Sequence, residues 1–323
     1  MPFNIVKQDI VTMKVDAIVN AANTELVMGG GVCGAIFKAA GPDQLQAACQ
    51  ALAPIKTGEA VITPAFALGA QYIIHAVGPN YRQWTQAESE RLLFNAYTNS
   101  LQLARENNCS SIAFPLISSG IYGYPLAEAL EVASSAIQAF LTKHELQVYL
   151  VLFNQADFSL KTKVLRPVQD YLNTHWLRED SVYLGENIAL DASRYHPKQA
   201  LELLPDLIDN LASSFSEKLL ELIDQKGLTD VEVYKRANID RKLFSKIRNK
   251  PTYSPSKRTA LALAIALELS LAETEDLLER AGYAMSRAVK FDVIIEYFIK
   301  SGQYDVFQIN QVLFDYEQAT LGS

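Results

Sequence analysis

Cysteine and histidine are scarce in this sequence, and their spacing argues against two common kinds of site. Among 323 residues there are only three cysteines, Cys33, Cys49 and Cys109, and four histidines. An odd number of scattered cysteines does not form a secreted disulfide framework, and no Cys-x-x-Cys or paired histidine spacing indicates a zinc site. We therefore expect no metal, no cofactor and a reducing, cytoplasmic environment.

Long apolar runs are lacking too. Although 49% of the residues are hydrophobic, no run approaches the roughly eighteen apolar residues of a transmembrane helix. Residues 1–5 lack the basic and apolar regions of a signal peptide, so we expect no membrane partner. The net charge of −7 argues against a protein that coats nucleic acid uniformly. The length favours two domains.

The most informative stretch is residues 16–41. A short apolar strand at 17–19 leads into Asn20-Ala21-Ala22-Asn23, and three glycines, Gly29 to Gly31, then precede an apolar-periodic helix. Glycines let the backbone approach a ligand closely, and a helix N-terminus favours an anion. No Lys-Ser/Thr pair follows the glycines, and G-x-G-x-x-G is absent, so neither a P-loop nor a Rossmann motif fits. The stretch predicts a site for a phosphate-bearing ligand.

Three further motifs follow in order: TGEAVIT at 57–63, YIIHAVGP at 72–79 and FPLISSGIYGYP at 114–125. Together with NAAN and GGGVCGAIFKAAG they resemble the macrodomain family, which binds ADP-ribose, over about the first 170 residues. The resemblance implies a three-layer α/β/α domain with a mostly parallel mixed sheet. It does not cover the second half of the chain.

The periodicity of residues 1–173 agrees with that fold, because apolar strands alternate with amphipathic helices. In such sheets ligands bind beyond the carboxyl ends of the strands, where the glycine-bearing stretches stand. We expect a helix stop at Gly41-Pro42. The expected strands are 3–6, 17–19, 59–63, 72–77, 111–115 and 147–153, and the expected helices are 33–40, 88–107, 126–141 and 158–172.

The resemblance assigns roles in the pocket. Asp9 would bind the adenine amino group, with a backbone contact from Ile10, and Phe153 would stack on the adenine. Asn20 would hold the loop, and Asn23 would contact the distal ribose and serve catalysis. From the residues alone, Asp9 fits a turn or cap residue better than a ligand contact. The asparagines could be turn formers and Phe153 a buried strand end, while His75 is expected to be a satisfied core residue. Two phosphate loops complete the ligand-binding set: Gly29, Gly30, Gly31 and Val32 in the first, and Ser118, Ser119, Gly120, Ile121 and Tyr122 in the second.

Cys33 departs from the family pattern. Many hydrolytic macrodomains carry Asp here, which is thought to position the attacking water, and viral members carry His where Met28 stands. A small structural residue and a reactive thiol both remain possible readings of Cys33. Members without the Asp can still hydrolyse with water held by the substrate phosphate, so slow, metal-independent turnover is compatible with the sequence.

After a connector at 174–212, residues 213–323 are purely helical in pattern. Capping-box signatures begin at Ser214, Thr229 and Ser270. Five short helices in about seventy residues resemble the helix-turn-helix domain of phage-repressor type, with helices two and three at 230–237 and 241–249. Residues 226–258 hold ten basic and three acidic side chains, a net +7 within an acidic chain. The expected DNA-facing residues are Arg241, Lys242, Ser245, Lys246 and Arg248.

Three functions therefore stay open. The chain could be an enzyme that removes ADP-ribose from protein or nucleic acid, or that hydrolyses esters of ADP-ribose. It could be a sensor of ADP-ribose or a related NAD-derived nucleotide, coupled to DNA binding. The helical domain could instead dock a protein partner, such as a toxin or defence protein. A homodimer is compatible with any of them.

Overall fold

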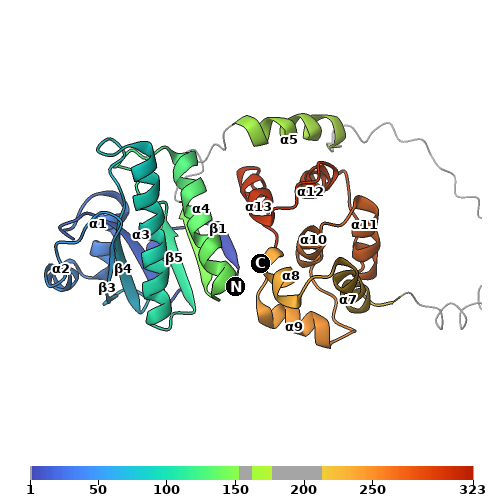
Figure 1. Cartoon of the computed structure of the whole chain (residues 1–323), viewed down its shortest axis with the longest axis horizontal. Helices are drawn as coiled ribbons and strands as arrows, with labels where there is room; N and C mark the ends of the chain where they lie inside the picture. The colour runs from blue at the N-terminus through green and yellow to red at the C-terminus, as the bar shows by residue number, and fades with distance from the viewer. Residues whose placement is uncertain (1, 153–161, 177–212, 323) are drawn as a thin grey trace, which may run out of the picture. The chain divides into compact units, whose positions relative to one another are not determined.

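The computed structural model describes residues 2–152, 162–176 and 213–322 (Figure 1). The chain divides into two compact units. The first comprises residues 1–165 together with 238–240 and 310–323, and the second comprises 166–237 and 241–309. Most of the expected connector, and Phe153, lie outside the described residues, so the predicted boundaries at 173 and 212 stay predictions.

The first unit is built on one six-stranded sheet of order β1-β6-β5-β2-β4-β3, in which only β3 is antiparallel to its neighbour. This confirms the predicted mostly parallel mixed sheet. Parallel strands need covered faces, and their apolar sequences supply the buried side chains. The strands are β1 (Phe3–Lys7), β2 (Ala17–Ala22), β3 (Ala60–Pro64), β4 (Tyr72–Val77), β5 (Ser111–Pro115) and β6 (Gln147–Leu152).

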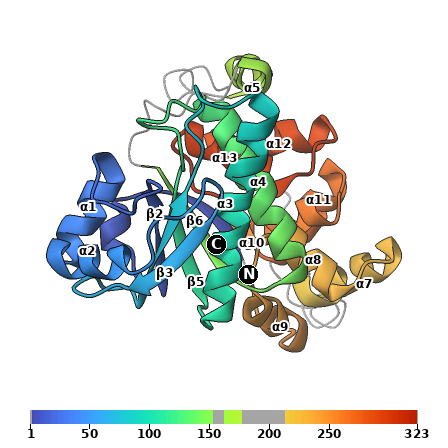
Figure 2. The ribbon, with the colours of Figure 1, turned by 60° about the vertical axis from the view of Figure 1, so that its left-hand side comes forward.

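Helices cover both faces of this sheet. Figure 2 shows α1 and α2 on one side and α3 and α4 on the other, which confirms the three-layer α/β/α fold. One core joins Ile18 and Ile73 of the sheet to Ile36 and Phe37 of α1. The remaining elements of this unit are η1 (Ile10–Thr12), α1 (Gly31–Ala40), α2 (Pro42–Gln50), α3 (Gln86–Glu106) and α4 (Leu126–Lys143). Most of α5 (Thr162–His175) belongs to the second unit, which begins at Arg166.

The expected helix stop at Gly41-Pro42 is confirmed, because α1 ends at Ala40. The sequence did not predict the next helix: Gly41 has φ of 100°, and Pro42 opens α2 at its first turn. Proline is accepted there because the first N–H groups of a helix have no intrahelical partner. Strand β2 was expected to end at Val19, yet it continues through Asn20 to Ala22 in register with β4. The polar Asn20 is tolerated because His75 lies opposite it.

The second unit is helical, as predicted, and its helix starts follow local chemistry. At Ser214, Thr229 and Ser270 the side chain accepts from the backbone N–H three residues on, and the glutamate there accepts from the cap backbone. These bonds confirm all three capping boxes. The helices that follow are α7 (Phe215–Lys226), α8 (Asp230–Arg236), α9 (Arg241–Asn249), α10 (Lys257–Ala266), α11 (Leu271–Arg280), α12 (Lys290–Lys300) and α13 (Val306–Asp315). The division between the two units falls within α13, after Ile309.

Helix α9 is strongly amphipathic, with one buried apolar face and one exposed polar face. Phe244 and Ile247 are buried as predicted, whereas the five residues expected to face DNA are exposed. Asn238, in the short turn between α8 and α9, has φ of 55°, a conformation that asparagine tolerates better than most residues. Arg248 forms an ion pair with Asp230, and the Lys246 ammonium lies 4.1 Å from the centre of the Tyr253 ring. The cations on α9 therefore differ in how free they are to reach a partner.

Candidate functional site

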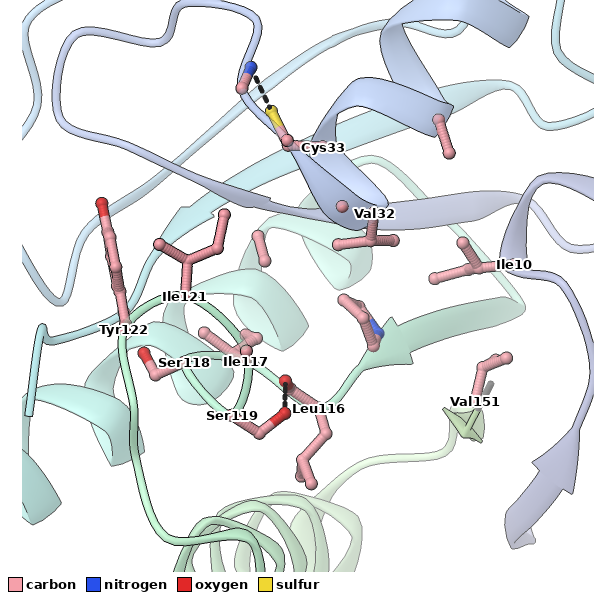
Figure 3. A pocket seen from close by; sticks show the side chains of 18 of the residues that line it. Ile10, Val32, Cys33, Leu116, Ile117, Ser118, Ser119, Ile121, Tyr122 and Val151 are labelled. Carbon is pink, nitrogen blue, oxygen red and sulfur yellow. Dashed lines mark hydrogen bonds between the residues drawn. The ribbon is translucent and has the colours of Figure 1, made fainter. Parts of the chain in front are cut away.

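A cavity of about 740 Å³ opens at the carboxyl ends of β2, β5 and β6 (Figure 3). Its walls come from the two glycine-bearing loops, from η1 and from the first turn of α1. Among the described residues that line it, Asp9 is the only charged one. The lining includes these residues predicted from sequence: Asp9, Ile10, Asn23, Gly29, Gly30, Gly31, Val32, Ser118, Ser119, Gly120, Ile121 and Tyr122.

The first loop, residues 23–30, is held in place by Asn23. Its amide nitrogen donates to the Val27 carbonyl at 2.8 Å, and its amide oxygen accepts from the Val27 N–H at 3.2 Å. Gly31 has φ of 59°, the left-handed region that favours glycine. A Cβ on Gly34 would lie 2.6 Å from the Gly29 carbonyl oxygen. The loop can therefore fold back on α1 only because residue 34 has no side chain.

The second loop, residues 116–124, has an equally defined backbone. Ser118 takes a φ of 67°, and its carbonyl accepts from the Tyr124 N–H at 3.0 Å. The Ser119 hydroxyl donates to the Leu116 carbonyl at 2.8 Å, a bond drawn in Figure 3. The buried Ser118 hydroxyl has no hydrogen-bond partner in the described part of the chain. Such a non-glycine residue at positive φ indicates that neighbouring atoms fix this loop.

Gly78, at the end of β4, is one of those neighbours. A Cβ there would lie 2.2 Å from Ser118 Oγ and 2.5 Å from Ile117 Cγ2. We expect Gly78→Ala to push the second loop away and lower the free energy of unfolding by about 1–3 kcal/mol. Thermal unfolding measures this loss. Gly69→Ala is the control, because a Cβ at Gly69 would meet nothing within 4 Å. Equal stability of the two variants would contradict the contact.

Asp9 stands at the opposite side of the cavity, where β1 leads into η1. One carboxylate oxygen accepts from the Val11 N–H at 3.1 Å, so Asp9 caps the short helix. The other oxygen has no protein partner among the described residues and is available to a donor on a ligand. The cap reading and the ligand-binding reading of Asp9 are therefore compatible, because they use different oxygens.

Asn20 needs a correction, because it does not line the cavity. Its side chain is fully buried behind the first loop. The amide nitrogen lies 3.1 Å from His75 Nδ1, and His75 Nε2 lies 3.0 Å from Thr63 Oγ1. Burial lowers the pKa of His75 to about 4, so the ring is neutral near neutral pH. Asn20 supports the site from behind, and His75 is the satisfied core histidine that we expected.

Cys33 lies at the N-terminal end of α1, where its sulfur borders the cavity (Figure 3). Two N–H groups point at Cys33 Sγ: the Gly29 backbone N–H at 3.4 Å and the Asn20 amide at 3.7 Å. The Val27 carbonyl oxygen lies 3.9 Å away as an acceptor for the thiol. The Cys33 sulfur therefore has two N–H donors and one carbonyl acceptor around it, and only 5% of the residue is exposed.

Several lining residues were missed from sequence because strand ends far apart in the chain supply them. Leu116 and Ile117 follow β5, Val151 and Leu152 end β6, and Gln8 precedes η1. The apolar character of the four strand-end residues indicates a core, and nothing in their spacing separates a cavity wall from a core position. The structural roles of Gly34 and Gly78 could have been suspected, since both stand inside the quoted motifs. Phe153, predicted to stack on a base, lies outside the described residues.

Two general properties bear on the site. In the described part of the chain, no three His, Cys, Asp or Glu side chains come close enough together to hold a metal ion. No helix within the described ranges is both long enough and apolar enough to span a bilayer.

Comparisons with known proteins agree with this architecture. The Macro domain family model matches residues 19–133. An O-acetyl-ADP-ribose deacetylase of Salmonella typhimurium is 48% identical over 167 residues, which span 50% of this chain and 92% of the relative. A macro domain-containing protein of Chlorobaculum tepidum is 45% identical over 171 residues, spanning 51% and 98% of the two chains. The chain belongs to the macrodomain family.

Solved structures resemble the same half of the chain. An Oceanobacillus iheyensis macrodomain with ADP is 41% identical, with a TM-score of 0.47, and the match covers 51% of this chain and 90% of that one. A Trypanosoma brucei macrodomain in complex with ADP-ribose is 34% identical, with a TM-score of 0.45, covering 48% and 66%.

Proposed function

We propose that the first unit binds ADP-ribose or an ADP-ribosyl derivative and hydrolyses ADP-ribosyl linkages by metal-independent attack of water at the distal ribose. The substrate is an ADP-ribosylated protein or nucleic acid, or an ester such as O-acetyl-ADP-ribose, the compound for which the Salmonella relative is named.

The observation that carries this proposal is the cavity between two glycine-bearing loops. Backbone N–H groups and the N-terminus of α1 favour an anion there, and the described residues of the lining include no lysine or arginine. A diphosphate held by N–H dipoles rather than by side-chain cations fits such a place. Asp9 and Ile10 at one side would take the adenine, and Tyr122 with Asn23 would take the distal ribose.

Asn23 is the residue that we assign to catalysis. Both ends of its amide already bond to Val27, but the second N–H and the second lone pair are left for a ribose hydroxyl or a water. No carboxylate lies beside it at position 33, so we expect water activation to depend on the substrate phosphate. Turnover should be slow and should need no added metal.

Calorimetry with ADP-ribose, with AMP as the comparison, tests the binding step. ADP-ribose should bind, and AMP should bind much more weakly because it lacks the second phosphate and the distal ribose. Release of acetate from O-acetyl-ADP-ribose and of ADP-ribose from a mono-ADP-ribosylated protein tests the hydrolytic step. Absence of ADP-ribose binding would overturn the proposal. Binding with no turnover of either substrate would favour the non-catalytic sensor instead.

We infer a second function for the helical unit: a helix-turn-helix domain that binds DNA through α9. The specific support is the net +7 over residues 226–258 of an otherwise acidic chain. The exposed face of α9 could present arginine to base edges and lysine to phosphates. Because Arg248 is paired with Asp230 and Lys246 lies over Tyr253, Arg241 and Lys242 are the better candidates for first contact.

We expect the full chain to bind a pool of genomic DNA fragments with an affinity that falls steeply as salt rises. Replacing Arg241 and Lys242 together by alanine should weaken binding about tenfold or more at low salt, because two phosphate or base contacts are lost. The control is Lys14→Ala with Lys56→Ala, which removes the same charge from exposed sites in the first unit. Fluorescence anisotropy measures both. If the parent shows no binding at low salt, the helical unit is a protein-docking module.

A further inference from the structure

We propose that Asn20 is a positioning residue for the side chain at position 33, and that Thr63 and His75 fix the orientation of the Asn20 amide. The inference deepens the proposed function, on which it rests, because position 33 borders the cavity beside Asn23 and Gly29. It connects the edge strand β3, on which no cavity-lining residue stands, to a group inside the cavity.

The chain of contacts starts at β3. Thr63 Oγ1 lies 3.0 Å from His75 Nε2, and both residues are buried. On the other side of the ring, His75 Nδ1 lies 3.1 Å from the Asn20 amide nitrogen. An amide nitrogen can only donate, so Nδ1 accepts and the ring proton sits on Nε2, from which it donates to Thr63. The Asn20 amide thus donates to His75, and His75 donates to Thr63.

The direction of these hydrogen bonds decides whether Cys33 Sγ faces the nitrogen or the oxygen of the Asn20 amide. The same Asn20 nitrogen lies 3.7 Å from Cys33 Sγ. The Asn20 oxygen is buried and has no partner among the described residues, so its NH₂ group alone determines how the amide is turned. If His75 carried its proton on Nδ1, the amide would turn its oxygen towards the ring and towards Cys33. The sulfur would then lose a donor and face an acceptor.

Thr63→Val removes the hydroxyl that accepts the Nε2 proton while keeping the size and branching of the side chain. The sulfur of Cys49, 3.6 Å from Nε2 and 3.9 Å from Nδ1, lies near both ring nitrogens and is the weaker acceptor. We expect His75 to move its proton to Nδ1 and the Asn20 amide to turn over. Cys33 Sγ then loses one N–H donor, and only the Gly29 N–H remains among the described donors. Among the described residues, the other titratable groups whose pKa values respond to the charge of Cys33 are Tyr122 and Cys49, and the substitution replaces neither of them.

The test follows alkylation of Cys33 by iodoacetamide in the full chain, resolved by peptide mass spectrometry. Near neutral pH, Thr63→Val should slow the reaction about fivefold or more, because the hydrogen bond to the charged sulfur is lost. Long-range proton–nitrogen NMR should show the His75 proton on Nε2 in the parent and on Nδ1 in the variant.

Two control variants separate orientation from packing. Thr63→Ser keeps the hydroxyl, so it should keep the parent rate and the Nε2 proton. Thr98→Val removes a hydroxyl that donates within α3, so it too should leave Cys33 unchanged. Equal rates in the parent and Thr63→Val, a Thr63→Ser variant as slow as Thr63→Val, or a parent whose Cys33 resists the reagent would each overturn the inference. The reaction contains no ADP-ribose, so its outcome is separate from that of the binding test.

Discussion

Gly30→Glu is expected to abolish ADP-ribose binding while leaving the protein folded. Gly30 has extended backbone angles, φ of −86° and ψ of −179°, that any residue can adopt. A Cβ there would meet only Ile121 Cδ1, at an ordinary 3.5 Å. The glutamate should therefore fit, and its carboxylate would stand where the diphosphate is proposed to bind. We expect affinity to fall about 100-fold or more, equivalent to ~3 kcal/mol.

Two variants make this result specific. Gly30→Gln adds nearly the same volume without the charge, so the difference between the two variants isolates the repulsion between carboxylate and phosphate. Gly69→Glu places the same charge on an exposed glycine with open space around it. Calorimetry gives the affinities and thermal unfolding checks the fold. If Gly30→Glu binds ADP-ribose as well as the parent does, the ligand lies elsewhere.

Cys33→Asp is expected to raise hydrolytic turnover, on the order of 100-fold if the carboxylate acts as a general base. The site already offers what a carboxylate needs, since the Gly29 N–H and the Asn20 amide both point at the side chain of residue 33. Such donors stabilise the ionised form of an acid. The new carboxylate would border the cavity beside Asn23, where it could orient or activate the attacking water.

The measurement is the initial rate of acetate release from O-acetyl-ADP-ribose at saturating substrate. Cys33→Asn is the matched control, because it has the shape of aspartate without the charge and should not gain activity. Cys33→Ala should retain the slow parent rate. A fast parent enzyme that loses all activity in Cys33→Ala would instead mean that the thiol itself takes part in the reaction.

The sequence predicted local structure best where adjacent residues decide it. The capping boxes at Ser214, Thr229 and Ser270 use atoms three residues apart, so their signature is visible in the chain itself. The end of α1 at Gly41-Pro42 was also predicted, but the sequence did not show that another helix, α2, follows it. Leu45 and Cys49 of that helix join the core under the sheet, and burial of this kind depends on contacts distant in sequence.

For the cavity too, the sequence predicted the residues of compact motifs and missed those that distant segments bring together. The glycine-bearing loops were found because their motifs are compact, whereas Leu116, Ile117 and Val151 form walls only once β5 and β6 are neighbours. Asn20 was placed among the ligand contacts because the resemblance to the family pairs it with Asn23. Asn20 can be buried because its amide pairs with His75, 55 residues away. The spacing of residues along the sequence does not predict that pairing.

The absence of lysine and arginine from the described cavity lining has a consequence for how the two proposed activities can be separated. Dissolved ions screen formal charges on exposed groups, but they act weakly on N–H dipoles inside a cavity. Raising ionic strength should therefore dissociate DNA from the helical unit while ADP-ribose stays bound. A buffer of high ionic strength would then report nucleotide binding alone, and dilution of the salt would restore the second activity in the same sample.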